Sequence, residues 1–462
     1  MKTIPTHPCP SHLPIERLLR RIRISLLMIG VSMLSLLGMQ SAQAVPSFAN
    51  QTGQSCVACH AGGQYPELTP YGRMFKLTGY TIGERSNPLA AMVVASRTST
   101  KNSDGSTLNG QSIVDFASVF LAGKVTDNIG GFAQYTQAFY DTQDANNNWK
   151  GHFAADNFDL RYADRQMDAK HDVVWGLTLH NNPSVQDVWN SSPAWGYPYV
   201  STTHGAYGAL PASTLVEGAL AQQVAGIGGY VFLNQSIYAE LTSYHTAKGA
   251  TSFLSYGSKA GDPDHALTLL DGNATYWRLA YTHDWGPQNV MVGAFGLTAR
   301  TFPNDGSTFM PVTSSGSTHF KDMGIDAQYH YLMSPHTFTA NFRSVHELIN
   351  DDSLTAYAGP ASLNTLMAKG SYVYREKYGG SLAYKTVTGS ADATAYSSLS
   401  AINVSDSSMW TTELFWMPLQ NVRLGIQYSW FTKYAGASAN YDGAGRNASD
   451  NATTYLYLWT AF

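Results

Sequence analysis

From about residue 89 to the end of the chain, apolar and polar side chains alternate with a period of two in several segments. Phe338 and Phe342, for example, flank Asn341 in a segment where every second residue is polar. The segments 277–282 and 422–430 show the same alternation. Successive side chains of a strand point to opposite faces, so this pattern predicts strands with one face suited to lipid and the other to a polar interior.

The connections between these segments alternate in length. Short turns are predicted near 127–130, 170–172, 234–235, 286–288, 334–336, 378–380 and 420–421, and long polar stretches at 183–212, 248–273, 302–318, 352–364 and 437–452. About sixteen strands joined in this way are typical of an outer-membrane β-barrel with short periplasmic turns and long outer loops. An even number of strands places both termini in the periplasm. The last strand is expected at 455–462, where both faces are apolar and neither is marked as the lipid face.

A large soluble β-sandwich or propeller is the alternative for residues 89–462. No repeat of about 40 to 50 residues supports a propeller, and a soluble fold leaves the alternation of link lengths unexplained. Composition favours the membrane barrel, since charged residues make up 13% of the chain, about half the usual fraction. After residue 44 there is no apolar run long enough for a spanning helix.

The N-terminus has the pattern of a secretory signal peptide. An apolar stretch at 24–37 follows a basic region and precedes the small-x-small sequence Ala42-Gln43-Ala44. The stretch is short for a membrane anchor, which is the competing interpretation. We therefore predict that residues 1–44 are removed and that the mature chain begins at Val45. This loss of five basic residues and one acidic residue changes the net charge from −4 to −8, which argues against nucleic acid as a partner.

Cys56, Cys59 and His60 form a C-x-x-C-H motif, the spacing of covalent c-type haem attachment. Two thiols three positions apart can bond to one porphyrin, and the adjacent imidazole can then bind its iron. A zinc site needs further soft ligands, but the only other cysteine, Cys9, lies in the predicted signal peptide. A redox dithiol of the thioredoxin type needs a βαβ context that is absent. The motif predicts one covalently bound haem c with His60 as an axial iron ligand.

Residues 45–88 are too few and too polar to fold alone, so the porphyrin is expected to supply much of their core. Thr69 as N-cap, Pro70 at the first helical position and Gly79 at the far end predict a short helix that covers one haem face. Met74 is a candidate sixth ligand of the haem iron. The alternatives are that Met74 only packs against the ring, that a barrel histidine binds the iron, or that the position is open.

Other candidate ligands in the barrel lack a recognisable pattern. The histidines show no metal-ligand spacing, among them His152, His180, His204, His245, His265, His283, His319, His330 and His346. Glu347, Asp351 and Asp352 could attract Fe²⁺ through carboxylate oxygens, but a solvated acidic loop is the expected interpretation. No motif for hydrolysis or phosphoryl transfer is present.

The haem segment resembles the fused monohaem cytochrome–porin family of outer-membrane iron(II) oxidases. The resemblance lies in residues 48–60, FANQTGQSCVACH, and residues 66–80, PELTPYGRMFKLTGY, while the barrel matches only in length and pattern. It implies that Cys56, Cys59 and His60 bind haem. It also implies that the Pro66-x-Leu68 and Gly72-Arg73-x-Phe75-Lys76 elements surround the haem.

The resemblance further implies an electron-transfer protein with ferrous-iron oxidase activity in the outer membrane of a Gram-negative bacterium. Extracellular Fe(II) would give its electron to the haem, which passes it to a periplasmic cytochrome c. Because a bilayer core is about 30 Å thick, we expect residues 45–88 to plug the lumen of the barrel. The alternatives are a conduit for another extracellular donor or acceptor, a transport porin in which haem only stabilises a plug, and a haem peroxidase with an open iron position.

Overall fold

A computed structural model describes residues 46–63, 66–101, 108–144, 146–183, 187–190, 210–218, 220–262, 265–352 and 361–462. The predicted signal peptide, residues 1–44, lies outside this part of the chain. Among the residues described, no helix has the length and apolar character needed to cross a membrane.

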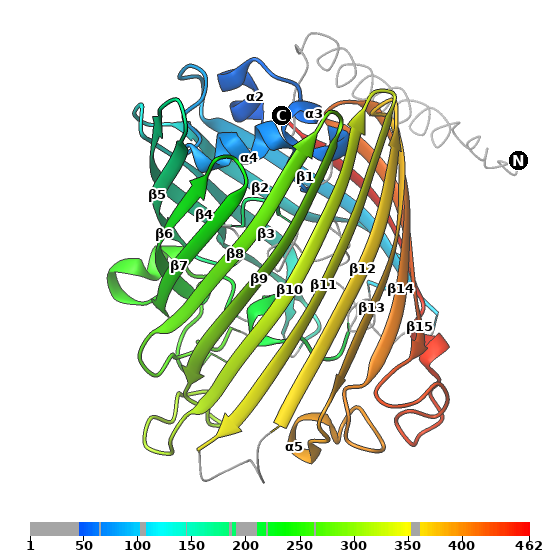
Figure 1. Ribbon diagram of the computed structural model, residues 1–462. Coiled ribbons are helices and arrows are strands. Elements are labelled where there is room, and N and C mark those ends of the chain that lie inside the picture. The colour runs from blue at the N-terminus through cyan, green and yellow to red at the C-terminus, as the bar shows by residue number, and fades with distance from the viewer. Residues whose placement is uncertain are drawn as a thin grey trace, which may run out of the picture. The chain divides into compact units, whose positions relative to one another are not determined.

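The described residues form a closed antiparallel barrel of sixteen strands, in which each strand pairs with the next and β1 pairs with β16 (Figure 1). The strands are β1 (Leu89–Thr100), β2 (Ser112–Lys124), β3 (Ile129–Gln143), β4 (Trp149–Met167), β5 (Asp172–His180), β6 (Val224–Leu233), β7 (Ile237–Thr246), β8 (Ala274–Trp285), β9 (Gln288–Thr301), β10 (Thr318–Met333), β11 (His336–Asp351), β12 (Ala361–Tyr374), β13 (Tyr378–Gly389), β14 (Ser407–Leu419), β15 (Val422–Lys433) and β16 (Thr453–Ala461). The predicted number of strands is therefore confirmed.

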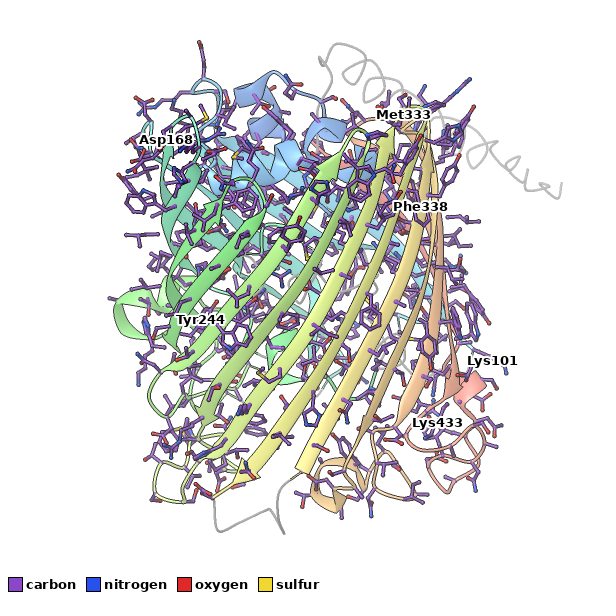
Figure 2. All side chains as sticks on the ribbon, viewed as in Figure 1. Lys101, Asp168, Tyr244, Met333, Phe338 and Lys433 are labelled. Carbon is purple, nitrogen blue, oxygen red and sulfur yellow. The ribbon has the colours of Figure 1, made fainter. Side chains whose placement is uncertain are left out.

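The two ends of the barrel differ in the length of their links. At one end the links have two to four residues, and at the other they have between five and 43. Figure 2 shows Asp168 and Met333 near the end with short links, and Lys101 and Lys433 toward the end with long links. Short turns face the periplasm in outer-membrane barrels, so the long links mark the outer end.

One predicted turn was misplaced. The link between β12 and β13 is formed by residues 375–377, where Arg375 and Glu376 take left-handed backbone angles (φ 51° and 57°). Gly379 and Gly380, which suggested the turn, belong to β13. A Cβ at Gly379 would lie 2.0 Å from the Phe415 ring, so this glycine makes room for a neighbouring aromatic side chain. The predicted long stretch at 352–364 also ends earlier, because β12 begins at Ala361, and the links 101–111, 144–148 and 390–406 were not predicted.

The barrel wall is apolar outside and polar inside. On β8, Leu279 is 55% exposed on the outer face, whereas its neighbour Arg278 is fully buried. On the closing strand β16, Leu456 and Leu458 are exposed and Tyr455 and Tyr457 are buried, which settles which face meets lipid. Other exposed apolar side chains of the wall include Leu241, Val292, Ile325 and Leu414. A closed barrel with an apolar outer face belongs in the outer membrane of a Gram-negative bacterium.

Replacing Leu279 with arginine tests this assignment of faces. Leu279 lies in the middle of β8, so L279R should place a charge near the bilayer midplane and lower the stability of the refolded barrel by about 2–4 kcal/mol. Leu419 is also exposed but is the last residue of β14, next to a short link, so L419R should cost about 1 kcal/mol or less. Equal losses for the two variants in denaturant titrations in lipid vesicles would contradict the assignment.

The residues before β1 lie at the end of the barrel with short links, where Figure 1 shows α2, α3 and α4. They form α2 (Pro46–Thr52), α3 (Cys56–Cys59), the 3-10 turn η1 (Ala61–Gly63) and α4 (Pro70–Leu77). The remaining short helices, η2 (Leu215–Glu217), η3 (Gly249–Leu254), α5 (Ala393–Tyr396) and η4 (Ala448–Asn451), lie in long links.

Candidate functional site

The C-x-x-C-H motif forms a single helical turn followed by extended chain. Cys56 and Cys59 are the first and last residues of α3, and the His60 N–H donates to the Cys56 carbonyl at 2.8 Å. His60 itself is extended (φ −114°, ψ 134°) and forms an antiparallel bridge with Leu68. The two thiols and the imidazole thus come from one short stretch of backbone and line one cavity.

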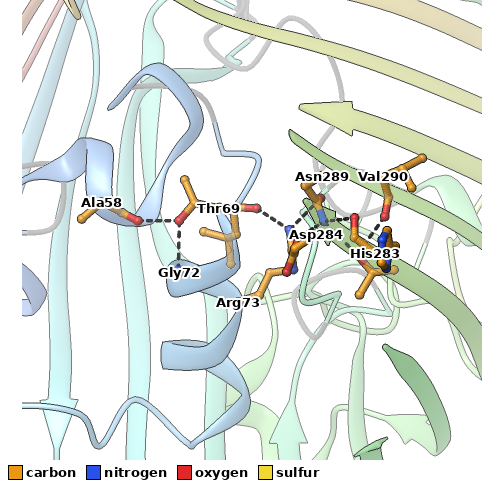
Figure 3. A network of polar contacts seen from close by, with 10 residues as sticks. Ala58, Thr69, Gly72, Arg73, His283, Asp284, Asn289 and Val290 are labelled. Atoms are coloured by element: carbon orange, nitrogen blue, oxygen red, sulfur yellow. Dashed lines mark hydrogen bonds and ion pairs between the residues drawn. The ribbon is translucent and has the colours of Figure 1, made fainter. Parts of the chain in front are cut away.

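Thr69 joins this turn to α4 (Figure 3). Its hydroxyl donates to the Ala58 carbonyl and accepts from the Gly72 N–H at 3.1 Å, while its own N–H donates to the Cys59 carbonyl at 2.9 Å. A Cβ at Gly72 would lie 2.2 Å from that same carbonyl oxygen, so only glycine allows this close approach. The predicted N-cap is confirmed, and it also fixes α4 against the cysteine turn.

The cavity beside the motif, together with the solvent space that opens onto it, has a volume of about 890 Å³. Four aromatic side chains line it, namely Phe48, Phe75, Tyr80 and Phe132. Phe48 stacks on Tyr80 with ring centroids 5.2 Å apart and meets Phe75 edge to face at 5.0 Å. An apolar cavity with two thiols and an imidazole on its wall has the chemistry needed to hold a planar apolar macrocycle such as haem.

The thiols do not have the character of a reactive redox pair. Burial and the neighbouring Cys56 raise the pKa of Cys59 to about 11, whereas reactive dithiols have a lowered pKa. In the part of the chain that the structure describes, the two cysteines are not joined in a disulfide.

The family elements divide between the two faces of α4. The cavity is lined by Pro66, Leu68, Gly72, Phe75 and Lys76, all from the elements that the resemblance would place around a haem, but not by Arg73 or Met74. Successive residues of a helix are rotated by about 100°, so Met74 lies opposite the face that carries Gly72, Phe75 and Lys76.

Met74 packs instead against a buried cluster of the barrel interior, whose members include Leu77, Val174, Trp189 and Tyr230. This placement does not bring the candidate sixth ligand to the cavity that contains His60.

The segment is held to the inward-facing wall by charged side chains. Buried Glu67 forms an ion pair with Lys369 and accepts from the Asn341 side chain at 2.6 Å. Arg73 reaches Asp284 at 3.3 Å and Asn289 at 3.1 Å (Figure 3).

At the far end of α4, the Tyr80 hydroxyl donates to Asp159 at 2.6 Å. Contacts therefore run from the segment to five strands, β4, β8, β9, β11 and β12.

Part of the long link between β5 and β6 also lies inside the barrel, which the sequence analysis did not predict. The Lys76 ammonium donates to the Asp187 carbonyl at 2.8 Å and to the Asn190 side chain at 3.1 Å, and the Leu68 N–H donates to the Trp189 carbonyl at 3.3 Å. Burial and nearby Arg161 lower the pKa of Lys76 to about 7. Asn190 also lines the cavity, so this outer link reaches the haem segment.

The acidic candidates differ in exposure, and Glu347 does not belong to a solvated loop. Glu347 is buried and accepts from the Leu215 N–H at 2.6 Å, and Asp322 next to it accepts from the Val216 N–H at 2.7 Å. The prediction was wrong for Glu347 because it alternates with outward residues of β11 and therefore faces the interior. Asp352 is exposed and lies 3.1 Å from His319.

Two of the histidines that lack metal-ligand spacing in the sequence lie close together in the structure. The fold brings His152 and His265 together with Asp141, residues whose separation along the chain hid the cluster. His204 lies outside the described residues.

Comparison with protein families finds no family model that matches this chain, and comparison with curated proteins finds no matching sequence. Among solved structures, the chain is similar to a loop L8 deletion mutant of OmpT, an outer membrane protein of Vibrio cholerae (11% identity, 81% of this chain and 98% of that one, TM-score 0.43). It is also similar to the outer membrane channel DcaP of Acinetobacter baumannii (9% identity, 81% of this chain and 96% of that one, TM-score 0.47). A third similar structure is an anion-selective porin from Comamonas acidovorans (11% identity, 81% of this chain and 98% of that one, TM-score 0.43). Identities this low do not extend to a shared function.

Proposed function

We propose that this protein is an outer-membrane cytochrome c that takes electrons from extracellular Fe(II) and delivers them to a periplasmic cytochrome c. The observation that carries the proposal is the apolar cavity on whose wall Cys56, Cys59 and His60 meet. A C-x-x-C-H turn can bind haem c through two thioether bonds and one imidazole. When bound, haem c supplies a one-electron centre between an outer donor and a periplasmic acceptor.

The chain's own residues hold and shield this centre. Phe48, Phe75, Tyr80 and Phe132 line the cavity and would surround a bound haem with apolar side chains, which favours electron transfer over ligand exchange. Glu67 and Arg73 fix the segment to the wall, so residues 45–88 act as a plug at the periplasmic end of the lumen.

The placement of the segment supports electron flow toward the periplasm. The cavity lies with the segment at the end of the barrel with short links, next to the periplasm, where a soluble cytochrome can approach. The path from an outer donor to the cavity is longer than the path from the cavity to the periplasm, because a bilayer core is about 30 Å thick. The inward-facing wall carries ion pairs such as Arg278–Asp326 and Arg423–Glu413, so the interior of the barrel is polar.

A transport porin is the second candidate, and the closed barrel with its polar interior favours it. Purified protein mixed anaerobically with Fe(II), with haem absorption as the readout, separates the two functions. Rapid reduction of the haem supports the conduit. A haem that reacts with dithionite but not with Fe(II), in a protein that conducts ions in planar bilayers, would replace the proposal with the transport porin.

The placement of Met74 gives a further prediction. We expect M74L to leave the haem spectrum and the reduction potential unchanged, because Met74 packs against Trp189 and its neighbours rather than lining the cavity. A leucine of similar volume should cost less than about 1.5 kcal/mol of stability. A change in the axial-ligand bands of the spectrum, or a marked fall in potential, would instead identify Met74 as the sixth ligand.

A further inference from the structure

Three potential metal ligands gather at the outer end of the barrel. Asp141 lies near the end of β3, His152 lies near the start of β4, and His265 belongs to the long link between β7 and β8. One ligand atom from each side chain lies within 4.8 Å of the other two, and all three residues are partly buried. They come from three separate parts of the chain, so the fold creates the cluster.

The side chains are already close to the arrangement that a cation needs. His265 Nε2 lies 2.8 Å from Asp141 Oδ2, and the two imidazole rings stack with centroids 4.3 Å apart. Metal–ligand bonds of about 2.0–2.2 Å place the ligand atoms of one ion roughly 3 Å apart. Ligand atoms within 4.8 Å of one another must therefore approach by at most about 2 Å to bind one ion.

The surrounding backbone holds the ligands in place. The Lys259 N–H donates to the His265 carbonyl at 3.0 Å, which fixes the backbone of His265. The carbonyl of Tyr256 lies 2.6 Å from His152 Nε2. Gly257 follows with a left-handed backbone (φ 79°), and a Cβ there would lie 3.1 Å from the His152 ring, so a glycine leaves space for this imidazole.

From this geometry we infer that Asp141, His152 and His265 form a binding site for a first-row divalent transition-metal cation. Two imidazoles and one carboxylate are a ligand set that binds Zn²⁺ and Fe²⁺ and leaves positions for water. Exposed carboxylates alone would bind such ions weakly, and the two neutral nitrogen ligands supply the selectivity over Mg²⁺ and Ca²⁺.

The site is a collecting position rather than part of the haem cavity. Asp141 and the cavity residue Phe132 both belong to β3 and are nine positions apart, which corresponds to about 30 Å along a strand. The assignment of Fe²⁺ as the natural cation rests on the proposed function. The cation site itself does not, because it follows from the ligands alone.

Titration of the purified full-length protein with Zn²⁺, followed by calorimetry in buffer free of chelators, tests the site. Zn²⁺ is redox-inert, so its binding is independent of any electron transfer to haem. We expect D141N and H265Q each to weaken the strongest Zn²⁺ site at least tenfold, since even the loss of an outer-shell partner costs about 10–100-fold.

H319Q is the matched control. His319 also lies at the outer end and pairs with a carboxylate, Asp352, at 3.1 Å. Among the residues that the structure describes, no second histidine joins this pair to form a group of three ligands. H319Q should bind Zn²⁺ as the unmodified protein does. Equal affinities in the unmodified protein, D141N and H265Q would overturn the site, with an unchanged haem spectrum showing that the variants are folded. If Zn²⁺ binds as expected but Fe(II) fails to reduce the haem of the unmodified protein, the proposed function fails and the cation site stands.

Discussion

Replacing Cys56 and Cys59 together with alanine is expected to abolish covalent haem attachment while the barrel still assembles. The two thiols lie on one helical turn and line one cavity, and no other cysteine is present after residue 44. The sixteen strands pair with one another without the segment, so their closure does not depend on it. Intact-protein mass spectrometry should show the mass of one haem in the unmodified protein and none in the double variant.

Val57 offers a matched control in the same turn. V57A leaves both thiols and His60 in place, so it should retain the haem mass. The double variant should also lose protection of residues 45–88 against protease, because the porphyrin supplies much of the core of this short segment. Masses that differ only by the two sulfur atoms removed in the double variant would mean that the motif does not bind haem covalently.

Replacing Lys369 with methionine is expected to release the N-terminal segment from the lumen. K369M leaves the Glu67 carboxylate fully buried without its cationic partner, and removal of one partner of a buried pair costs about 3–5 kcal/mol. About 1.4 kcal/mol corresponds to a tenfold change in an equilibrium constant, so the open fraction of the segment should rise at least about a hundredfold. Trypsin cleavage at the buried Arg73 and Lys76 measures that fraction, because both residues are inaccessible while the segment is docked.

A second variant separates charge from packing. E67Q/K369M removes both charges and should restore most of the protection against trypsin. Replacing both partners of a buried ion pair lowers stability much less than removing one of them. K124M, which breaks the Lys124–Asp127 pair at the barrel surface, is a matched control and should leave cleavage unchanged. Unchanged cleavage in K369M would show that the Glu67–Lys369 pair does not hold the segment.

The barrel could be predicted from the sequence because its determinants are local. Each wall residue faces either lipid or the interior, so Arg278 and Leu279 carry the alternation in adjacent positions. The start of α4 could be predicted for the same reason, because its determinants, Thr69 and Pro70, act within one helical turn. The misplaced turn at 378–380 shows the limit of such signals, because Gly379 serves a neighbouring strand rather than a turn.

The interior of the barrel could not be predicted, because its contacts join distant parts of the chain. Glu67 and Lys369 lie 302 positions apart, and Asp141 and His265 lie 124 apart, so no spacing rule connects them. Helical geometry alone indicates that Met74 and Phe75 point in different directions, but it does not indicate which of them faces the cavity. That choice depends on the link that brings Trp189 against the opposite face of α4.

The most direct test of the proposed electron path uses intact anaerobic cells and Fe(II) held by a chelator too large to cross porins. The haem spectrum is recorded after mixing, with cells that carry the Cys56 and Cys59 double variant as the control. We predict rapid reduction of the haem in cells with the unmodified protein and none in the control cells. A haem that stays oxidised under these conditions, yet is reduced by dithionite, would contradict electron uptake from extracellular iron.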